Sequence, residues 1–355
     1  MARPDASQER HARDAQGAAG VSRAWWPWAR RGLTLLFFAT VGVLLVRFGS
    51  QVQWHAVWAT VLSKPVPTLA WAAALAAFSH ALVASYDLIG RRATGHALSI
   101  PNVLSVAWVA YVFNLNLGAL VGGVGFRFRL YTRLGLDKAT IAQVYGWSVL
   151  TNWLGYLVLI GGVLLLSPDT IPAKWHPGQP ATATLGGLLV LVALAYLLGC
   201  GFATRRSWQW RGHGFTLPSG RIALTQLLMS VLNWLAIAAV IGVLLGDSIA
   251  FTDVLGAILL AAVAGAISHV PAGLGVLEAV FIALLGDAMP TNDILAALLT
   301  YRAIYYLAPL AVGLVALATM ESRRRKKNAA PAPAPLPAAR PHTRRVRAGV
   351  TGTGS

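Results

Sequence analysis

Charged residues are scarce in this chain. Asp, Glu, Lys and Arg make up 12% of the 355 residues, whereas hydrophobic residues make up 56%. An average soluble domain carries roughly twice that charged fraction, so the composition excludes a soluble globule and predicts a polytopic membrane protein. Acidic residues are fewer than basic residues, 12 against 29, which gives a net charge of +17. In a membrane protein this charge favours anionic lipid headgroups as partners, and no nucleic acid is expected.

Cysteine and catalytic motifs are also missing. The single Cys200 excludes an intrachain disulfide and a thiolate metal cluster. The eight His are scattered, and the sequence contains no HExxH, no P-loop lysine and no nucleophile elbow. We therefore expect a protein that is not an enzyme and that needs no cofactor and no metal. No cleavable signal peptide is expected either, because roughly thirty mostly polar residues precede the first apolar run.

Apolar runs predict eight or more helical membrane segments. Full spans are expected at 32–48, 67–90, 140–166, 184–203, 221–246 and 294–318. Two further apolar stretches, 101–139 and 252–287, are interrupted by glycines and polar residues. Irregular backbone within a bilayer is tolerated only where it is buried in protein or lines a watery cavity. We predict an all-α polytopic membrane protein with six full transmembrane helices plus two oppositely oriented re-entrant, broken helical hairpins.

Basic residues predict the orientation. Clusters lie in both tails and at 91–92, 127–138 and 204–211. If each hairpin enters and leaves on one side, all of these clusters face the cytoplasm, and the outer loops carry only Lys64 and Lys174. The halves 32–166 and 184–318 then form an inverted repeat, which is typical of carriers. We expect a bacterial inner-membrane protein with both termini cytoplasmic. Whether 252–270 crosses outright stays open, since it would measure about 28 Å.

Two polar tails flank the membrane domain, which we expect to extend over 32–320. Residues 1–31 form a basic cytoplasmic tail with a Trp-rich interfacial anchor at 25–28. Residues 321–355 form a second basic cytoplasmic tail, rich in Ala and Pro, which is predicted to be disordered.

The interruption in the second hairpin is the strongest functional candidate. Pro271, Gly273 and Gly275 predict a hairpin tip, and Glu278 follows at once. A charge within the membrane costs about 2.5–3.5 kcal/mol, more than the ~0.3–1 kcal/mol that a helix N-terminus supplies. Glu278 is therefore expected to meet a cation, a headgroup amine or a coupling proton, with a structural role at its helix end as the alternative. His269 would titrate near neutral pH and gate the tip.

Arg302 lies inside the last span, about 14 Å deep at 1.5 Å per residue. It is expected either to pair with Glu278 or to hold a lipid phosphate, for which its planar fork of donors is suited. Tyr305 would flank it, as a substrate contact or as packing.

The first hairpin carries polar and flexible candidates. Gly122 and Gly123 predict its tip. Asn114 and Asn116, which precede the tip, would satisfy free backbone groups there or contact a substrate.

Charged candidates surround the first hairpin. Arg127 and Arg129 follow its tip, and they are expected to be either interfacial positive charge or a phosphate site. Asp87, on the preceding span, is expected to pair with Arg91 four residues later, with a proton-linked role as the alternative.

Three motifs together resemble one membrane family. They are Asn114-x-Asn116 followed by Gly122-Gly123 and Arg127, Pro271-x-Gly273-x-Gly275-x-x-Glu278, and Tyr301-Arg302-x-x-Tyr305-Tyr306. Over about 30–320 the chain resembles the flippase-like domain of lysylphosphatidylglycerol synthases, in particular the stand-alone YbhN-type inner-membrane proteins. The resemblance implies translocation of phospholipid, including aminoacylated phosphatidylglycerol, between leaflets. Only the basic tail follows the last span, so the aminoacyl transfer of the full synthases is not expected.

These observations favour movement of an anionic or aminoacylated phospholipid through a groove between the two hairpins. No nucleotide site is visible, so movement would be passive or coupled to an ion. Two alternatives stay open: a small-solute or ion secondary transporter, and a non-transporting scaffold for lipid synthesis or envelope assembly. Phospholipids are the expected partners, and a second copy of the chain or a lipid-synthesis enzyme is left open as a further one.

Overall fold

The structure, a computed structural model, describes residues 62–167, 178–204, 207–210, 213–268 and 270–329, with four isolated helical positions before them. For 207–210 and 213–216 only the backbone is described. The Trp anchor at 25–28, nearly all of the span at 32–48, and His269 lie outside the described residues, so their roles stay predictions.

Long apolar helices dominate the described chain. Within it, seven helical segments are long and apolar enough to cross a membrane. They are α3 (Val66–Thr94), α4 (Ile100–Leu117), α6 (Lys138–Leu166), α7 (Gln179–Phe202), α8 (Gly220–Leu245), α9 (Phe251–Ser268) and the continuous segment Thr291–Met320. That last segment comprises α11 (Thr291–Arg302), the π-helical η5 (Ala303–Leu307) and the start of α12 (Ala308–Ala329). The predicted class, an all-α polytopic membrane protein, is confirmed.

Two of these helices turn back into short arms. α4 continues through the π-helical η1 (Ala119–Gly125) into α5 (Phe126–Arg133), and α9 continues through the 3₁₀ turn η4 (Pro271–Gly273) into α10 (Val276–Leu285). At 1.5 Å per residue α10 measures about 15 Å, too short for a hydrocarbon core of about 30 Å. α4 and α9 would each measure about 27 Å. The count of six full spans and the inverted repeat therefore stay predictions.

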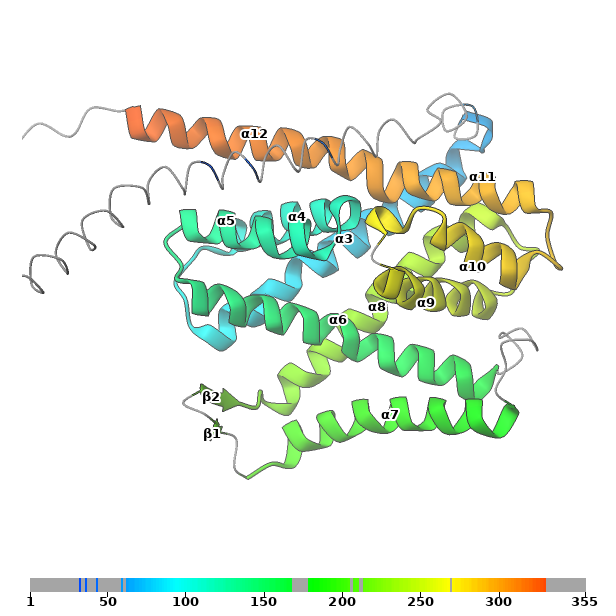
Figure 1. Cartoon of the computed structure of the whole chain (residues 1–355), viewed down its shortest axis with the longest axis horizontal. Helices are drawn as coiled ribbons and strands as arrows, with labels where there is room; N and C mark the ends of the chain where they lie inside the picture. The colour runs from blue at the N-terminus through cyan, green and yellow to red at the C-terminus, as the bar shows by residue number, and fades with distance from the viewer. Residues whose placement is uncertain are drawn as a thin grey trace, which may run out of the picture. The chain divides into compact units, whose positions relative to one another are not determined.

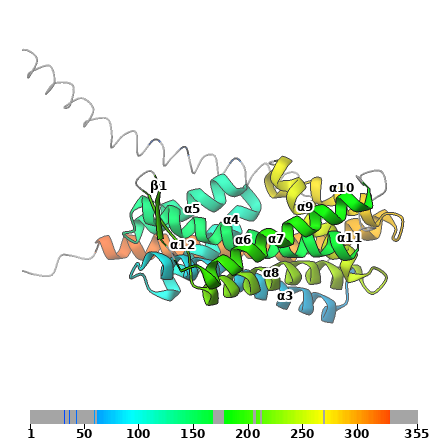
Figure 2. The same ribbon diagram turned by 90° about the horizontal axis from the view of Figure 1, so that it is seen from below.

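The two hairpins approach each other tip to tip. Figure 1 places α4–α5 and α9–α10 in opposite halves of the helical bundle, and the quarter turn of Figure 2 keeps them apart along the same axis. α4 packs against η4, so the tip of the second hairpin meets the first. The full-length α3, α6 and α8 run past both hairpins and hold them in place.

Small residues let the long helices approach closely. A Cβ added at Gly155 of α6 would lie 2.5 Å from Ser230 Oγ of α8, and one at Gly161 would lie 2.8 Å from the carbonyl oxygen of Gly186 of α7. Lipid tails are as apolar as the helices, so no hydrophobic force drives the helices together. Their association depends instead on such close packing and on interhelical hydrogen bonds. The glycines of α6 thus fix its position between two neighbours.

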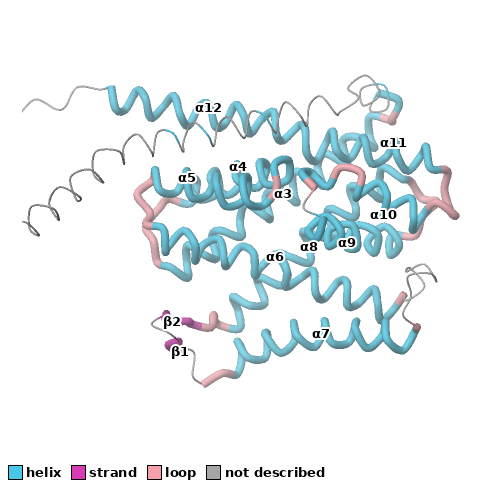
Figure 3. Tube along the Cα trace, in the orientation of Figure 1, coloured by secondary structure: helices cyan, strands magenta, loops and turns pink. Residues whose placement is uncertain are grey.

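A short antiparallel ribbon joins α7 to α8. It consists of β1 (Ser207–Trp210) and β2 (His213–Thr216), with Ser207 opposite Thr216. Figure 3 shows the two strands in magenta beside the helices. A ribbon of four residues per strand is too short to give a period-two pattern, so the sequence did not predict it.

The chain divides into two units, 1–316 and 317–355. In the second unit, the described residues are the continuation of α12, which stays helical to Ala329. The tail that was predicted to be disordered from 321 therefore begins as a helix.

Candidate functional site

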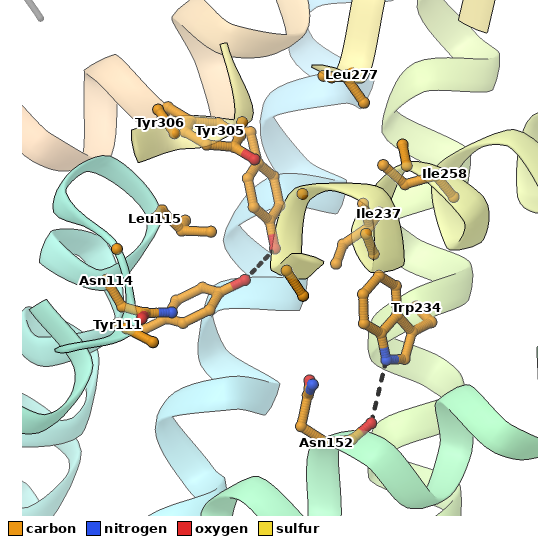
Figure 4. A pocket seen from close by; sticks show the side chains of 18 of the residues that line it. Tyr111, Asn114, Leu115, Asn152, Trp234, Ile237, Ile258, Leu277, Tyr305 and Tyr306 are labelled. Carbon is orange, nitrogen blue, oxygen red and sulfur yellow. Dashed lines mark hydrogen bonds between the residues drawn. The ribbon is translucent and has the colours of Figure 1, made fainter. Parts of the chain in front are cut away.

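A cavity of about 310 Å³ lies where the two hairpin tips meet. Its lining includes Tyr111, Asn114, Gly118 and Ala119 of the first hairpin, Ala262, Gly265, Ala272 and Gly273 of the second, Asn152 and Trp153 of α6, Asn233 and Trp234 of α8, and Tyr305 and Tyr306 of η5. Figure 4 shows the labelled side chains gathered around this space. The irregular backbone of both hairpins thus borders a cavity, the setting in which a bilayer tolerates it.

One wall of the cavity is a chain of hydrogen-bonded side chains. The hydroxyl oxygens of Tyr111 and Tyr305 lie 2.9 Å apart (Figure 4). The Tyr305 hydroxyl is also 2.6 Å from Ser79 Oγ, which donates to Asn233 Oδ1 at 2.6 Å. These residues come from α4, η5, α3 and α8, so the chain ties four elements together. A buried polar network of this kind holds its members in one arrangement when it is satisfied.

The π-helical turn η5 gives this wall a backbone contact. His80 of α3 donates from Nε2 to the carbonyl oxygen of Tyr305 at 3.1 Å. In a regular α-helix that carbonyl bonds the amide four residues later, whereas a π-turn changes the pattern and often marks a functional site. The Tyr305 side chain is turned toward Ser79 and Tyr111. The ring beside the Arg302 guanidinium is instead that of Tyr306, whose centroid is 5.7 Å from it.

Asn114 and Asn152 bring carboxamide groups to the cavity from α4 and α6. Both are half-buried, and neither carboxamide makes a hydrogen bond to the described part of the chain. The backbone of Asn152 is fixed, because its carbonyl oxygen accepts from Ser230 Oγ at 2.7 Å and from Trp234 Nε1 at 3.2 Å. Figure 4 shows its side chain directed into the space between Tyr111 and Trp234. Both carboxamides therefore keep hydrogen-bonding groups that the described part of the chain does not use.

Trp153 is an exposed residue of the cavity lining. It is 38% exposed, although it lies near the middle of α6, about 22 Å along the helix at 1.5 Å per residue. Exposure at that depth faces lipid rather than bulk water when α6 spans the bilayer. On a spanning α6 the exposed part of Trp153 would therefore face the acyl chains.

The start of α6 is fixed by Asp137. Its Oδ1 accepts from the backbone N–H groups of Ala139 at 2.9 Å and Thr140 at 3.0 Å, while the Thr140 hydroxyl donates to Oδ2. Asp137 thus caps the helix that carries Asn152. Hydrogen bonds from the Thr140 hydroxyl and backbone lower the pKa of the Asp137 carboxyl below its ordinary value of 3.8.

Glu278 and Arg302 form an ion pair across the second hairpin. Arg302 Nε donates to Glu278 Oε1 at 2.7 Å, and Nη2 donates to Oε2 at 3.0 Å. The remaining donors reach the tip itself, because Nη1 and Nη2 bond the carbonyl oxygens of Ala272 and Gly273 at 2.8 and 3.1 Å. Glu278 Oε2 also accepts from the Gly275 N–H at 2.9 Å. One arginine of α11 therefore holds the whole tip.

Three residues of this tip have a left-handed backbone conformation. Gly273 and Gly275 have φ of 57° and 78°, which glycine adopts without steric cost. Ala272 has φ of 56°, and it is the one residue other than glycine with positive φ in the described chain. The Pro-x-Gly-x-Gly pattern is thus explained by the turn that it builds, and Ala272 carries the strain.

A second ion pair anchors the first hairpin. Arg127 of α5 donates to both carboxylate oxygens of Asp87 of α3, from Nε at 3.0 Å and from Nη2 at 3.2 Å. Tyr131 adds a hydroxyl donor to the same carboxylate at 2.9 Å, and Arg127 Nη1 reaches the Gly123 carbonyl oxygen at 3.3 Å. The expected pair of Asp87 with Arg91 is wrong. Arg91 instead donates from Nε to the Leu98 carbonyl oxygen at 2.7 Å, closing the loop after α3.

Gly122 and Gly123 lie after the turn of the first hairpin and not at its tip, where they were predicted. The chain reverses at Gly118, where φ is 83°, whereas Gly122 and Gly123 lie in η1 and are buried. A Cβ at Gly122 would lie 2.2 Å from the backbone of Phe113, and one at Gly123 would lie 2.9 Å from Asn114 Oδ1. The pair therefore lets the returning arm touch α4.

The other predicted site residues lie apart from the cavity lining. Asn116 is fully buried, and its Nδ2 donates to the Val112 carbonyl oxygen at 2.9 Å while Oδ1 has no partner. Arg129 is half-buried on α5. Sequence reasoning did not single out Tyr111 or Trp234 as lining. The three-residue spacing of Tyr111 and Asn114, which puts both on one face of a helix, was an available signal for the first.

The next feature is the charge of the described cavity lining. Among the described lining residues none is charged. Arg127 and Arg302 each make four hydrogen bonds within the protein, and Glu278 is bonded on both oxygens. Phosphate capture by these arginines stays a prediction, and it requires the ion pairs to open.

Comparison with known proteins identifies the family. The family model described as "Lysylphosphatidylglycerol synthase TM region" matches residues 33–313. The chain is 42% identical to the inner membrane protein YbhN of Escherichia coli over 306 residues, which cover 86% of this chain and 96% of that protein. It is 29% identical to an uncharacterized protein of Synechocystis over 294 residues, 81% of this chain and 89% of that one.

A third relative is longer. The phosphatidylglycerol lysyltransferase of Staphylococcus haemolyticus is 28% identical over 253 residues, which cover 68% of this chain and 28% of that protein. The matched part thus corresponds to a membrane region within a larger protein. From the family match and the run of apolar helices, the chain belongs to the lysylphosphatidylglycerol synthase transmembrane family and is a multi-pass inner-membrane protein.

Proposed function

We propose that this protein moves phospholipids between the two leaflets of the inner membrane, with the headgroup passing through the cavity between the hairpins and the acyl chains staying in the bilayer. The proposal assigns movement of lipid, and no chemical step, to these residues. It keeps both termini on the cytoplasmic side, as the distribution of basic residues favours.

The observation that carries the proposal is the position of the cavity. Both hairpin breaks border it, through Gly118 on one side and Gly273 on the other, and we take the exposed Trp153 of its lining as a lateral opening. A headgroup in this cavity would lie between two arms that approach from opposite ends of the bundle. A lateral opening suits an amphipathic substrate, because only its polar part then has to leave the interface.

The two ion pairs are the contacts that would break when a hairpin moves. Each joins a hairpin to a neighbouring helix, Arg127 to Asp87 of α3 and Glu278 to Arg302 of α11. In this arrangement both are closed. A lipid phosphate offers the same bidentate acceptor geometry as a carboxylate, so it would take the place of either carboxylate on its arginine when a hairpin moves. Capture of phosphate by Arg127, Arg129 or Arg302 belongs to such an opened arrangement.

Two further points support a lipid substrate. One relative is named a phosphatidylglycerol lysyltransferase, and that name places a lipid among its substrates. The described part of the cavity wall is also mostly apolar and aromatic with a few convergent polar groups, which is the usual composition of a small-molecule site.

The proposal is tested by reconstituting the full chain into vesicles that contain acyl-labelled fluorescent phosphatidylglycerol. Dithionite bleaches only the label in the outer leaflet, so wild-type protein should expose inner-leaflet label that protein-free vesicles protect. Ala262→Phe should block this movement, because Ala262 lines the cavity and a benzyl group fills it.

The matched control is Ala264→Phe, which changes the same helix outside the described cavity lining. It should leave lipid movement unchanged. Protection of the label equal to that in protein-free vesicles for wild-type protein, or equal movement by both Phe variants, would contradict the proposal.

A further inference from the structure

We infer that the cavity recognises the uncharged, hydroxyl-bearing end of a lipid headgroup, such as glycerol or a sugar, through the carboxamides of Asn114 and Asn152. The inference rests on the proposed function, in that the ligand is a lipid, and it names the class of headgroup. It differs from recognition of a phosphate or an amine at the same place.

The absence of charge on the described cavity wall is the first argument. Transfer of a phosphate or an ammonium group into a confined site is costly unless an opposite charge meets it there. Arg302 uses four hydrogen bonds on Glu278 and the hairpin tip, and Arg127 is bonded to Asp87, Gly123 and Ser148. An uncharged group enters this arrangement without breaking either ion pair.

Hydrogen-bond complementarity is the second argument. A carboxamide offers two N–H donors and one carbonyl acceptor. A hydroxyl both donates and accepts, so neighbouring hydroxyls can satisfy both ends of the carboxamides of Asn114 and Asn152. An ionised phosphate only accepts and an ammonium only donates, and each would leave half of these groups unpaired. Unpaired polar groups in a confined site lower affinity, and this is how such sites discriminate.

The aromatic lining is the third argument. Trp153 and Trp234 lie beside Asn152. The ring of Tyr111 lies beside Asn114, and its hydroxyl bonds that of Tyr305 at 2.9 Å. Figure 4 shows Asn152 between the ring of Tyr111 and that of Trp234. Rings that present flat apolar faces beside amides suit a polyol, which has carbon-bound hydrogens on its faces and hydroxyls at its edge. The cavity volume of about 310 Å³ is at the lower end of small-ligand sites.

The same features disfavour an aminoacylated headgroup. Esterification of glycerol with lysine consumes a hydroxyl and adds a cation. Glu278 is the carboxylate nearest to the hairpin tip in sequence, and both of its oxygens are already bonded to Arg302. Unmodified phosphatidylglycerol and uncharged glycolipids are therefore the expected ligands.

The inference is tested by isothermal titration of the detergent-solubilised full chain with dihexanoyl lipids below their micelle concentration. The probes are phosphatidylglycerol, a glucosyl diacylglycerol, phosphatidic acid and phosphatidylethanolamine. Phosphatidic acid lacks the terminal glycerol, and phosphatidylethanolamine replaces its hydroxyls with an amine. Phosphatidylglycerol and the glucosyl lipid should bind roughly tenfold more tightly than the other two, as expected for the loss of one or two hydrogen bonds.

Three variants test which side chains produce the preference between lipids. Asn114→Leu and Asn152→Leu keep the side-chain volume and should abolish the difference between lipids. Asn102→Leu, on the exposed first turn of α4, should retain it. Equal binding of all four lipids by wild-type protein, tighter binding of phosphatidic acid or phosphatidylethanolamine, or a preference that survives in both cavity variants would overturn the inference. The wild-type comparison decides the matter even where a variant fails to fold.

The vesicle assay separates this inference from the proposed function. A binding preference without lipid movement overturns translocation and leaves headgroup recognition standing. Movement of all four headgroups at one rate, without a binding preference, overturns recognition and leaves translocation standing.

Discussion

Glu278 binds Arg302 through both carboxylate oxygens, and one of those oxygens also accepts the Gly275 N–H. The carboxylate thus caps its own helix and neutralises the arginine of α11 at the same time. The Asp87–Arg127 pair does the equivalent work for the first hairpin, with the arginine on the hairpin and the carboxylate on the long helix. Both arginines also bond carbonyl oxygens of a hairpin break. The charges in this domain therefore fix the two interruptions of the helices.

The first prediction concerns the Glu278–Arg302 pair. Glu278→Gln leaves the guanidinium partly unpaired, and Arg302→Met leaves the carboxylate unpaired, so each should lower the free energy of unfolding by up to about 3–5 kcal/mol. The double variant should cost less than the sum, because no charge is stranded. Unfolding by dodecyl sulfate titration in mixed micelles measures all three. Asp293→Asn on the exposed start of α11 is the control and should change little. Additive losses would contradict the pairing.

Some of this site was predictable from the sequence. Pro271, Gly273 and Gly275 marked a turn because each has a backbone property that a continuous helix cannot use. The Glu278–Arg302 pair was one of two predictions for Arg302, because opposite charges within the membrane stabilise each other. The membrane class followed from composition, and the all-α fold followed from the apolar runs.

Other contacts were not predictable, for physical reasons. Asp87 was assigned to Arg91 because the two lie one helical turn apart, but an i,i+4 pair on a helix is worth only about 0.3–0.5 kcal/mol. The three-donor site formed by Arg127 and Tyr131 exists only after α5 folds back against α3. Contacts across forty residues leave no periodic pattern in one sequence. The role of Gly122 is hidden in the same way, because its close neighbour is the backbone of Phe113.

The second prediction concerns that glycine. Gly122→Ala places a Cβ 2.2 Å from the backbone carbonyl of Phe113, and the backbone cannot yield as a flexible side chain would. The arm α5 should be displaced, with a loss of about 1–3 kcal/mol or more from overpacking. Gly162→Ala on α6 is the matched control, because no atom lies within 4 Å of its added Cβ. It should be neutral or stabilising by up to about 1 kcal/mol. Equal melting temperatures for the two variants would refute the close approach.

The third prediction concerns strain at Ala272. Its φ of 56° costs an L-residue about 1–2 kcal/mol relative to glycine. Ala272→Gly should relieve that strain, with part of the gain offset by the larger backbone entropy of glycine in the unfolded chain. Ala272→Val should lower stability, because a β-branched residue fits this region least well. The order Gly, Ala, Val in unfolding free energy, measured in the same micelles, is expected. The reverse order would show that the tip does not adopt this conformation.

The fourth prediction concerns pH at the start of α6. The pKa of Asp137 is lowered below 3.8 by hydrogen bonds from Thr140, so the folded protein binds a proton there less readily than the unfolded chain does. The stabilisation from Asp137 is therefore complete above its ordinary pKa and is lost as pH falls through the lower, folded value. Asp137→Asn can still cap the helix but does not titrate. The advantage of wild type over this variant should be largest near about pH 6 and shrink toward about pH 3, since the remaining carboxylates are common to both proteins. An advantage that does not change with pH would mean that the carboxylate charge contributes nothing to the cap.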